Sequence, residues 1–154
     1  MKPIIPFSCS LILLSCVLFP ASVIAAAAPE PPPAGVLQID HTKVDAAFAS
    51  GSVVTANSSF KVLAGRRTAP GEVEIHEHDT DIFYVLDGSA TFVTGGTAVA
   101  PQPTAPGEIR AKEMTGGVPH QLVKGDVIVI PAGVPHQFTA VSGTFLYYVV
   151  KVTH

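Results

Sequence analysis

Residues 125–136 read GDVIVIPAGVPH, and this stretch decides the fold. Its residues 127–130 form a short β-branched run, as is typical of a strand in a sheet. A Pro-Ala-Gly sequence follows at 131–133 and predicts a sharp turn. The next strand then begins at His136. The stretch therefore predicts two strands joined by a tight turn, with an imidazole where the second strand starts.

Six further runs along the chain have the same short, β-branched or aromatic character. They are residues 59–64, 72–76, 82–86, 90–94, 121–123 and 145–152. Glycine, proline and aspartate separate them, as at Asp87-Gly88, and such residues predict turns. Seven or more short strands predict an all-β fold, an antiparallel barrel or sandwich. The Pro-rich stretch 95–117 predicts an insertion or lid-like loop, in which residues 107–112 could pair as a strand.

One short helix is expected before the strands, over residues 40–49 (DHTKVDAAFA). Asp40 is placed to cap its N-terminus, and Gly51 is placed to end it. Three apolar residues recur at helical spacing: Val44, Ala47 and Phe48.

The first 26 residues predict a segment separate from the fold. Lys2 is followed by an apolar run and then by small residues, the order found in a secretory signal peptide. Residues 27–35 are Pro-rich and predict an extended linker, so the folded domain is expected at 36–154.

Two alternatives to a cleaved signal peptide are a retained membrane anchor and a lipoprotein acylated at Cys16. The prolines that bound the apolar run disfavour an anchor, because a membrane span needs about 18 uninterrupted apolar residues. The apolar residues after Cys16 disfavour the lipoprotein. We therefore expect an exported protein, periplasmic or secreted, with no membrane attachment after cleavage.

Charge and cysteine content exclude several classes of function. The chain has 9 Lys and Arg against 12 Asp and Glu, a net charge of −3 at pH 7. This balance forms no basic patch, so nucleic acid is not expected as a partner. Both cysteines, Cys9 and Cys16, lie in the predicted signal peptide. The exported domain would then hold no thiol, which excludes cysteine catalysis and thiolate metal sites.

Several groups able to bind a metal lie close together at residues 72–78, which read EVEIHEH. If this segment is extended, Glu74, His76 and His78 share the face opposite Val73 and Ile75, because successive side chains of a strand alternate between its two faces. Three candidate ligands would then lie on one surface.

The stretch that opened this section resembles the second motif of the cupins, G(x)5PxG(x)2H. It matches that motif at Gly125, Pro131, Gly133 and His136, while the closing Asn of the motif is Ala140 here. The resemblance covers about Phe60 to Val150, which is most of the predicted domain. It implies a single-domain cupin, a jelly-roll-like double-stranded β-helix barrel.

The first cupin motif, G(x)5HxH(x)3-4E(x)6G, is matched less completely. Six residues separate Asp81 from Gly88, as the acid-to-glycine spacing of the motif requires. Counting back from Asp81 places His76 at the second histidine of the motif and Glu74 at the first. The other register, with His76 and His78 as the pair, leaves one residue too few before Asp81.

The resemblance implies a metal site in the mouth of the barrel, where the two motifs meet. Two imidazoles and one carboxylate hold a divalent metal and leave coordination positions open. His76, Asp81 and His136 would supply this set, and oxygen and nitrogen donors suit Fe, Mn, Ni, Zn or Cu. The candidates for a fourth ligand are Glu74, His78 and His120.

Each of these residues also has an ordinary structural interpretation. Asp81 suits an Asx turn after residues 78–80, and Glu74 suits an exposed strand face. His78 suits a solvent-facing strand end. His120 follows Gly-Gly-Val-Pro and favours a role in loop packing.

Two classes of function follow from the resemblance. One is a metal-dependent enzyme of the oxygenase or isomerase type, with Glu74 as proton acceptor and a small-molecule substrate. The other is a small-ligand-binding or structural module without turnover. A third option is a structural or partner-binding barrel without a metal, and the resemblance implies that edge strands would allow association as a homodimer.

Overall fold

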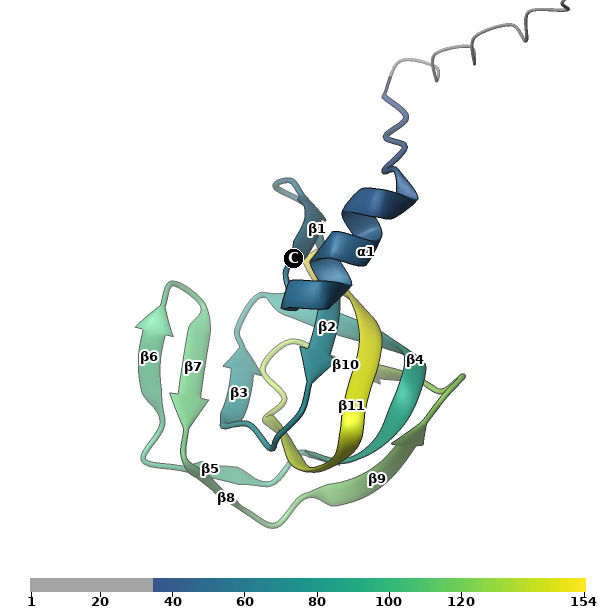
Figure 1. Ribbon diagram of the computed structural model, residues 1–154. Coiled ribbons are helices and arrows are strands. Elements are labelled where there is room, and N and C mark those ends of the chain that lie inside the picture. The colour runs from purple at the N-terminus through teal and green to yellow at the C-terminus, as the bar shows by residue number, and fades with distance from the viewer. Residues whose placement is uncertain (1–34) are drawn as a thin grey trace, which may run out of the picture. The chain divides into compact units, whose positions relative to one another are not determined.

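The computed structural model describes residues 35–154, of which Leu37–His154 form one compact unit. This unit holds one helix and eleven strands. Nine of the strands pair antiparallel in a main sheet that curls on itself (Figure 1). The predicted all-β barrel with a short N-terminal helix is confirmed. No helix within the described residues is long and apolar enough to cross a membrane. The predicted signal peptide, with its two cysteines, lies outside the described residues, as does nearly all of the predicted linker.

Two long strands, β4 (Asp79–Thr94) and β11 (His136–Thr153), pair along most of their length and form the centre of the sheet. Shorter strands surround them, and a separate two-stranded ribbon joins β5 (Thr97–Val99) to β8 (Glu113–Thr115). The other strands of the main sheet are β1 (Val53–Ala56), β2 (Phe60–Arg67), β3 (Val73–His76), β6 (Gln102–Ala105), β7 (Glu108–Ala111), β9 (Val118–Val123) and β10 (Val127–Ile130).

The turn predicted at Asp87-Gly88 is wrong, because β4 runs through it without a break. The register between β4 and β11 shifts here, with Asp87 opposite Leu146 and Ser89 opposite Ser142. Gly88 has a positive φ of 80°, and a Cβ at this position would collide with the carbonyl oxygen of Thr144. The glycine therefore permits a close approach of two strands and does not end one.

The lid-like loop predicted at residues 95–117 is also wrong. This stretch forms the four short strands β5 to β8, and the strand predicted at 107–112 is confirmed as β7. β7 pairs with β3, with Glu108 directly opposite His76. This pairing brings a carboxylate from the stretch to the histidine of β3.

The helix α1 (His41–Ser50) confirms the prediction to within one residue. The Asp40 side chain accepts a hydrogen bond from a backbone N–H of the first turn, and Gly51 ends the helix in the left-handed conformation. The ring of Phe48 packs edge-on against Tyr148 of β11, with 5.0 Å between centroids. An aromatic contact thus anchors the helix to the sheet.

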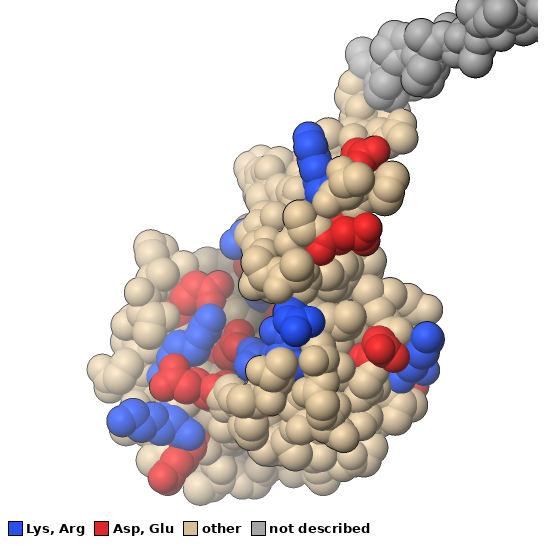
Figure 2. Space-filling model, viewed as in Figure 1, with Lys and Arg blue, Asp and Glu red and all other residues tan. Residues whose placement is uncertain are grey.

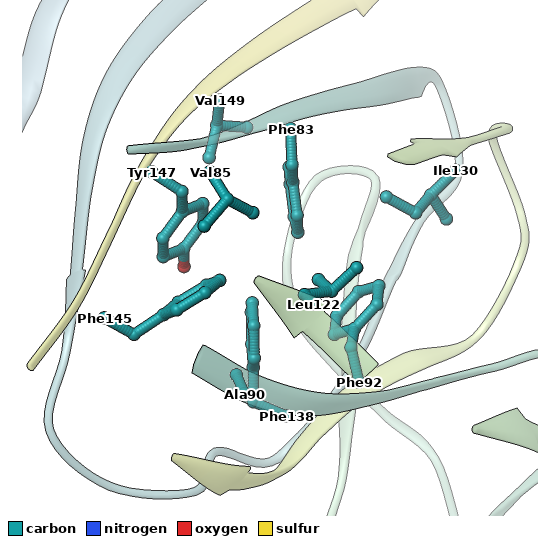
Figure 3. Close-up of a cluster of buried hydrophobic side chains, with 10 residues drawn as sticks. All are labelled: Phe83, Val85, Ala90, Phe92, Leu122, Ile130, Phe138, Phe145, Tyr147 and Val149. Carbon is teal, nitrogen blue, oxygen red and sulfur yellow. The ribbon is translucent and has the colours of Figure 1, made fainter. Parts of the chain in front are cut away.

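The core consists of apolar side chains from β4, β9, β10 and β11 that face the inside of the curled sheet (Figure 3). Phe92 and Phe145 are fully buried. The rings of Phe83 and Phe138 stack nearly parallel at 6.1 Å, and Tyr147 packs against both. These three rings also line the cavity next to the histidines. Core and site therefore share a wall.

Replacing Gly65 by alanine is expected to destabilise the fold. A Cβ at this position of β2 would lie 2.5 Å from the ring of Tyr147. Overpacking of this kind typically costs about 1–3 kcal/mol, measured as the free energy of unfolding in urea. The same change in a Tyr147→Ala background is expected to cost much less. Equal losses in both backgrounds would show that the ring is not the cause.

Candidate metal centre

Four polar side chains meet where β3, β4 and β11 come together. Glu74 and His76 lie on β3, Asp81 on β4 and His136 at the start of β11. His136 pairs directly with Glu74 across the two strands. His76, Asp81 and His136 are only 2–3% exposed. The sheet thus brings together residues from both predicted motifs in a buried position.

The distances within this group suit a single ion. Nε2 of His76 lies 3.6 Å from a carboxylate oxygen of Glu74 and 3.5 Å from one of Asp81. The imidazole rings of His76 and His136 have centroids 5.1 Å apart. Donor atoms of Glu74, His76 and His136 all lie within 4.8 Å of one another, and they form the candidate metal site among the described residues.

His76 is held so that one ring nitrogen remains available. Its Nδ1 lies 2.9 Å from a carboxylate oxygen of Glu108 on β7. Its Nε2 is buried without a hydrogen-bond partner. Metal-bound histidines are commonly oriented by a carboxylate on the other ring nitrogen. The arrangement of His76 therefore matches that of a metal ligand.

The ring of His136 is oriented in a similar way, with Nδ1 hydrogen-bonded and Nε2 available. Its Nδ1 lies 3.0 Å from the carbonyl oxygen of Val134, so this nitrogen carries the proton and donates to the carbonyl. The lone pair of a neutral ring is then on Nε2. Burial lowers the pKa of His136, and this outweighs the opposing effect of the hydrogen bond to Val134. The ring is therefore neutral near pH 7, the form that binds metals.

Glu74 is ionised and paired with arginines. Its Oε1 accepts a hydrogen bond from Nη2 of Arg67 at 2.8 Å, and its Oε2 lies 3.5 Å from Nη2 of Arg110. Burial alone would raise the pKa of Glu74, but the charges of Arg110 and Arg67 outweigh it and bring the pKa below its usual value. The carboxylate is thus in the charged form that a metal requires.

Asp81 has a different partner. Nζ of Lys151 on β11 donates to both of its carboxylate oxygens, at 2.7 and 2.8 Å. Lys151 is 9% exposed and Asp81 2%. Both members of this ion pair are therefore removed from water.

The candidate site residues predicted from the sequence did not include Lys151, Glu108, Arg67 or Arg110. A signal for Lys151 was present in the pattern of β11, where Phe145, Tyr147 and Val149 alternate as buried residues and Lys151 continues the same face. A lysine in such a series must find a buried partner. Glu108 had no comparable signal, because only the pairing of β7 with β3 places it beside His76.

His78 and His120 lie apart from the donor group found in the described residues. His78 is exposed beyond the end of β3, where its ring lies next to Gly107. His120 is half-buried on β9, with its Nε2 2.8 Å from the hydroxyl of Thr94. The geometry thus gives each of them a local contact.

A cavity of about 350 Å³ adjoins the group, within the size range of small-ligand sites. Its polar wall includes Arg67, Glu74, Asp81, His136 and Lys151, and its apolar wall includes Phe83, Phe138 and Tyr147 of the core. Figure 2 shows acidic and basic side chains gathered side by side over the area of β3, β6 and β7. The cavity is thus lined by both charged and apolar side chains.

Solved structures of other proteins resemble the fold of this chain. Hydroquinone 1,2-dioxygenase from Sphingomonas sp. TTNP3 matches with a TM-score of 0.51 and 14% identity over 66% of this chain and 64% of that one. DMSP lyase DddQ from Ruegeria pomeroyi matches with a TM-score of 0.45 and 20% identity over 63% of this chain and 40% of that one. The chain thus spans less than two thirds of either protein.

A third solved structure matches over a similar share of this chain. It is an uncharacterized conserved protein with a double-stranded beta-helix domain from Klebsiella pneumoniae, with a TM-score of 0.48 and 18% identity over 67% of this chain and 75% of that one. No curated protein matches the chain. The family model described as Cupin matches residues 51–154. The chain therefore belongs to the cupin family.

Proposed function

We propose that this protein is an exported cupin that holds one divalent metal between Glu74, His76 and His136 and takes a small molecule into the adjoining cavity. The observation that carries the proposal is the buried Nε2 of His76, which has no hydrogen-bond partner and lies 3.6 Å from the Glu74 carboxylate. Burying a polar atom without a partner is unfavourable. A bound metal would satisfy this nitrogen.

The donor set fits a first-row divalent ion. Two imidazole nitrogens and a carboxylate oxygen suit Fe, Mn, Ni, Zn or Cu, and they occupy only part of the coordination sphere. A divalent ion bound there would supply Lewis-acid chemistry at its open positions. Glu108 would orient His76, and the backbone carbonyl of Val134 would orient His136.

The charges around the cavity favour an anionic small molecule, such as a small organic acid. The buried or half-buried charges of its wall are two cations, Arg67 and Lys151, and two anions, Glu74 and Asp81. These balance one another without a metal. A divalent ion would leave two positive charges in a poorly solvated space, and an anionic ligand would neutralise them.

Binding without turnover is the second candidate function, and the state of Glu74 favours it. The two arginines that lower the pKa of this carboxylate make it a weak proton acceptor. Asp81 is occupied by Lys151. Screening small carboxylic acids against the metal-loaded protein separates the two functions. Thermal stabilisation without product indicates a binding module, whereas a detected product indicates an enzyme of the oxygenase or isomerase type.

Elemental analysis of the protein purified from its native compartment tests the metal proposal. We expect about one divalent metal per chain, as in other mononuclear sites. A metal content at the level of a protein without metal sites would contradict the proposal.

Export and self-association are further parts of the proposal. Cleavage near residue 26 predicts a mature N-terminus at the start of the Pro-rich linker, which N-terminal sequencing of the native protein would detect. A chain that keeps residues 1–26 would contradict export with cleavage.

Exposed valines at 118, 123, 127 and 129 on β9 and β10 support the proposed homodimer. A monomer at micromolar concentration in size-exclusion chromatography would contradict it.

Alanine at Glu108 is expected to weaken metal binding without removing a ligand. The carboxylate holds Nδ1 of His76 at 2.9 Å, and loss of such a partner typically lowers metal affinity about 10–100-fold. A chelator-competition titration measures the change. The matched control is Glu113→Ala, at an exposed position of β8, for which no change is expected. Equal affinities for both variants would show that Glu108 does not support the site.

A further inference from the structure

Asp81 occupies the position of the acidic residue in the first cupin motif. Its carboxylate, however, is paired with a lysine. The register of β4 and β11 places Lys151 directly opposite Asp81. The ammonium group donates to Oδ1 at 2.7 Å and to Oδ2 at 2.8 Å. Both carboxylate oxygens are therefore engaged by a buried cation.

We infer that Lys151 holds Asp81 out of the metal coordination sphere, so that Glu74 is the only carboxylate ligand from the protein. This inference rests on the proposed metal site. A metal bound to either oxygen of Asp81 would lie within about 5 Å of the Lys151 ammonium, and little water would separate the two positive charges.

Glu74 differs from Asp81 at the oxygen that faces the histidine. Its Oε1 is bound to Arg67 at 2.8 Å. Its Oε2 lies 3.6 Å from Nε2 of His76 and 3.5 Å from the nearest nitrogen of Arg110, beyond a short hydrogen bond in both cases. Glu74 thus has one oxygen without a short hydrogen bond, whereas both oxygens of Asp81 are hydrogen-bonded to the Lys151 ammonium.

The ion pair has two consequences for the site. Lys151 neutralises the charge of Asp81. The three ligands Glu74, His76 and His136 then carry one net negative charge, whereas a set of four that included Asp81 would carry two. It also leaves one more coordination position open for a small molecule. Lys151 is therefore a positioning residue, which acts on the metal through Asp81.

Cobalt(II) binding to the full chain tests this inference, because its visible absorption reports the number of ligands and competition with a chelator gives the affinity. Five proteins are compared: wild type, Lys151→Met, Asp81→Asn/Lys151→Met, Lys124→Met and His76→Ala/His136→Ala. Asp81→Asn/Lys151→Met, called the double variant below, replaces the ion pair by neutral side chains of similar size. The Lys124 variant loses the same charge at an exposed turn residue.

We expect the double variant to keep the wild-type spectrum and an affinity within about threefold, since it keeps all three ligands. Lys151→Met frees Asp81, so its affinity should rise about tenfold or more and its spectrum should indicate an added ligand. Lys124→Met should match wild type. A loss of affinity of about tenfold or more in the double variant would overturn the inference, because it would show that Asp81 binds the metal beside Lys151.

Two further outcomes separate this inference from the proposed function. If wild type fails to bind cobalt while Lys151→Met binds it, the proposed function is contradicted. The inference that Lys151 keeps Asp81 from binding a metal is then supported. If neither protein binds cobalt more tightly than a His76→Ala/His136→Ala variant, both fail. Thermal unfolding of all variants shows whether they are folded, and the neutral double variant keeps the test valid if Lys151→Met alone is too unstable.

Discussion

Alanine at both His76 and His136 is expected to lower the affinity for divalent metals by about a thousandfold or more. Protein metal sites bind with roughly 10–16 kcal/mol in favourable cases, shared among three or four ligands, so two lost imidazoles remove several kcal/mol. Both rings are buried, and a ring nitrogen of each lies within 4.8 Å of the other and of a Glu74 carboxylate oxygen. Isothermal titration calorimetry with Zn²⁺, or chelator competition, measures the loss.

The matched control is a second pair of histidines that the sequence also suggested as ligands. His78 and His120 lie outside the donor group of the described residues. The His78→Ala/His120→Ala variant is therefore expected to bind metal within about threefold of wild type. Similar losses in both double variants would show that the site is not where the geometry places it.

Methionine at Lys151 is expected to destabilise the fold by about 3–5 kcal/mol, because it leaves a buried carboxylate without its counter-ion. Asp81 is 2% exposed, and one of its oxygens lies 3.5 Å from Nε2 of His76. Urea unfolding of the metal-free protein gives the free energy of unfolding.

The neutral pair Asp81→Asn/Lys151→Met is the control for this loss. Replacing both members of a buried ion pair is often nearly neutral, so most of the stability should return. A Lys151→Met protein within about 0.5 kcal/mol of wild type would show that the pair is not essential to the fold.

Much of the fold could be predicted from the sequence, because short β-branched runs and turn residues alternate along most of the chain. The predictions fail where glycine or proline has a role inside a sheet. Gly88 was taken as a turn residue, but it permits a close approach inside β4. Residues 102–105 include Pro103. β6 tolerates this proline because it is an edge strand of the sheet.

Only those residues of the candidate site that belong to local sequence motifs could be predicted. Alternation along residues 72–78 placed Glu74 and His76 on one face, and the turn motif supplied His136. The ion pairs depend on contacts between distant segments. Lys151 lies 70 residues from Asp81, and Glu108 lies 32 residues from His76. Strand register decides these contacts, and the sequence pattern does not specify the register between segments so far apart.

The most direct test of the metal centre is anomalous X-ray scattering from crystals of the protein loaded with cobalt or manganese. The account predicts one strong peak at about 2.0–2.2 Å from Nε2 of His76, Nε2 of His136 and a carboxylate oxygen of Glu74. Asp81 should remain bound to Lys151. A peak elsewhere, or the absence of any peak among these three residues at saturating metal, would contradict it.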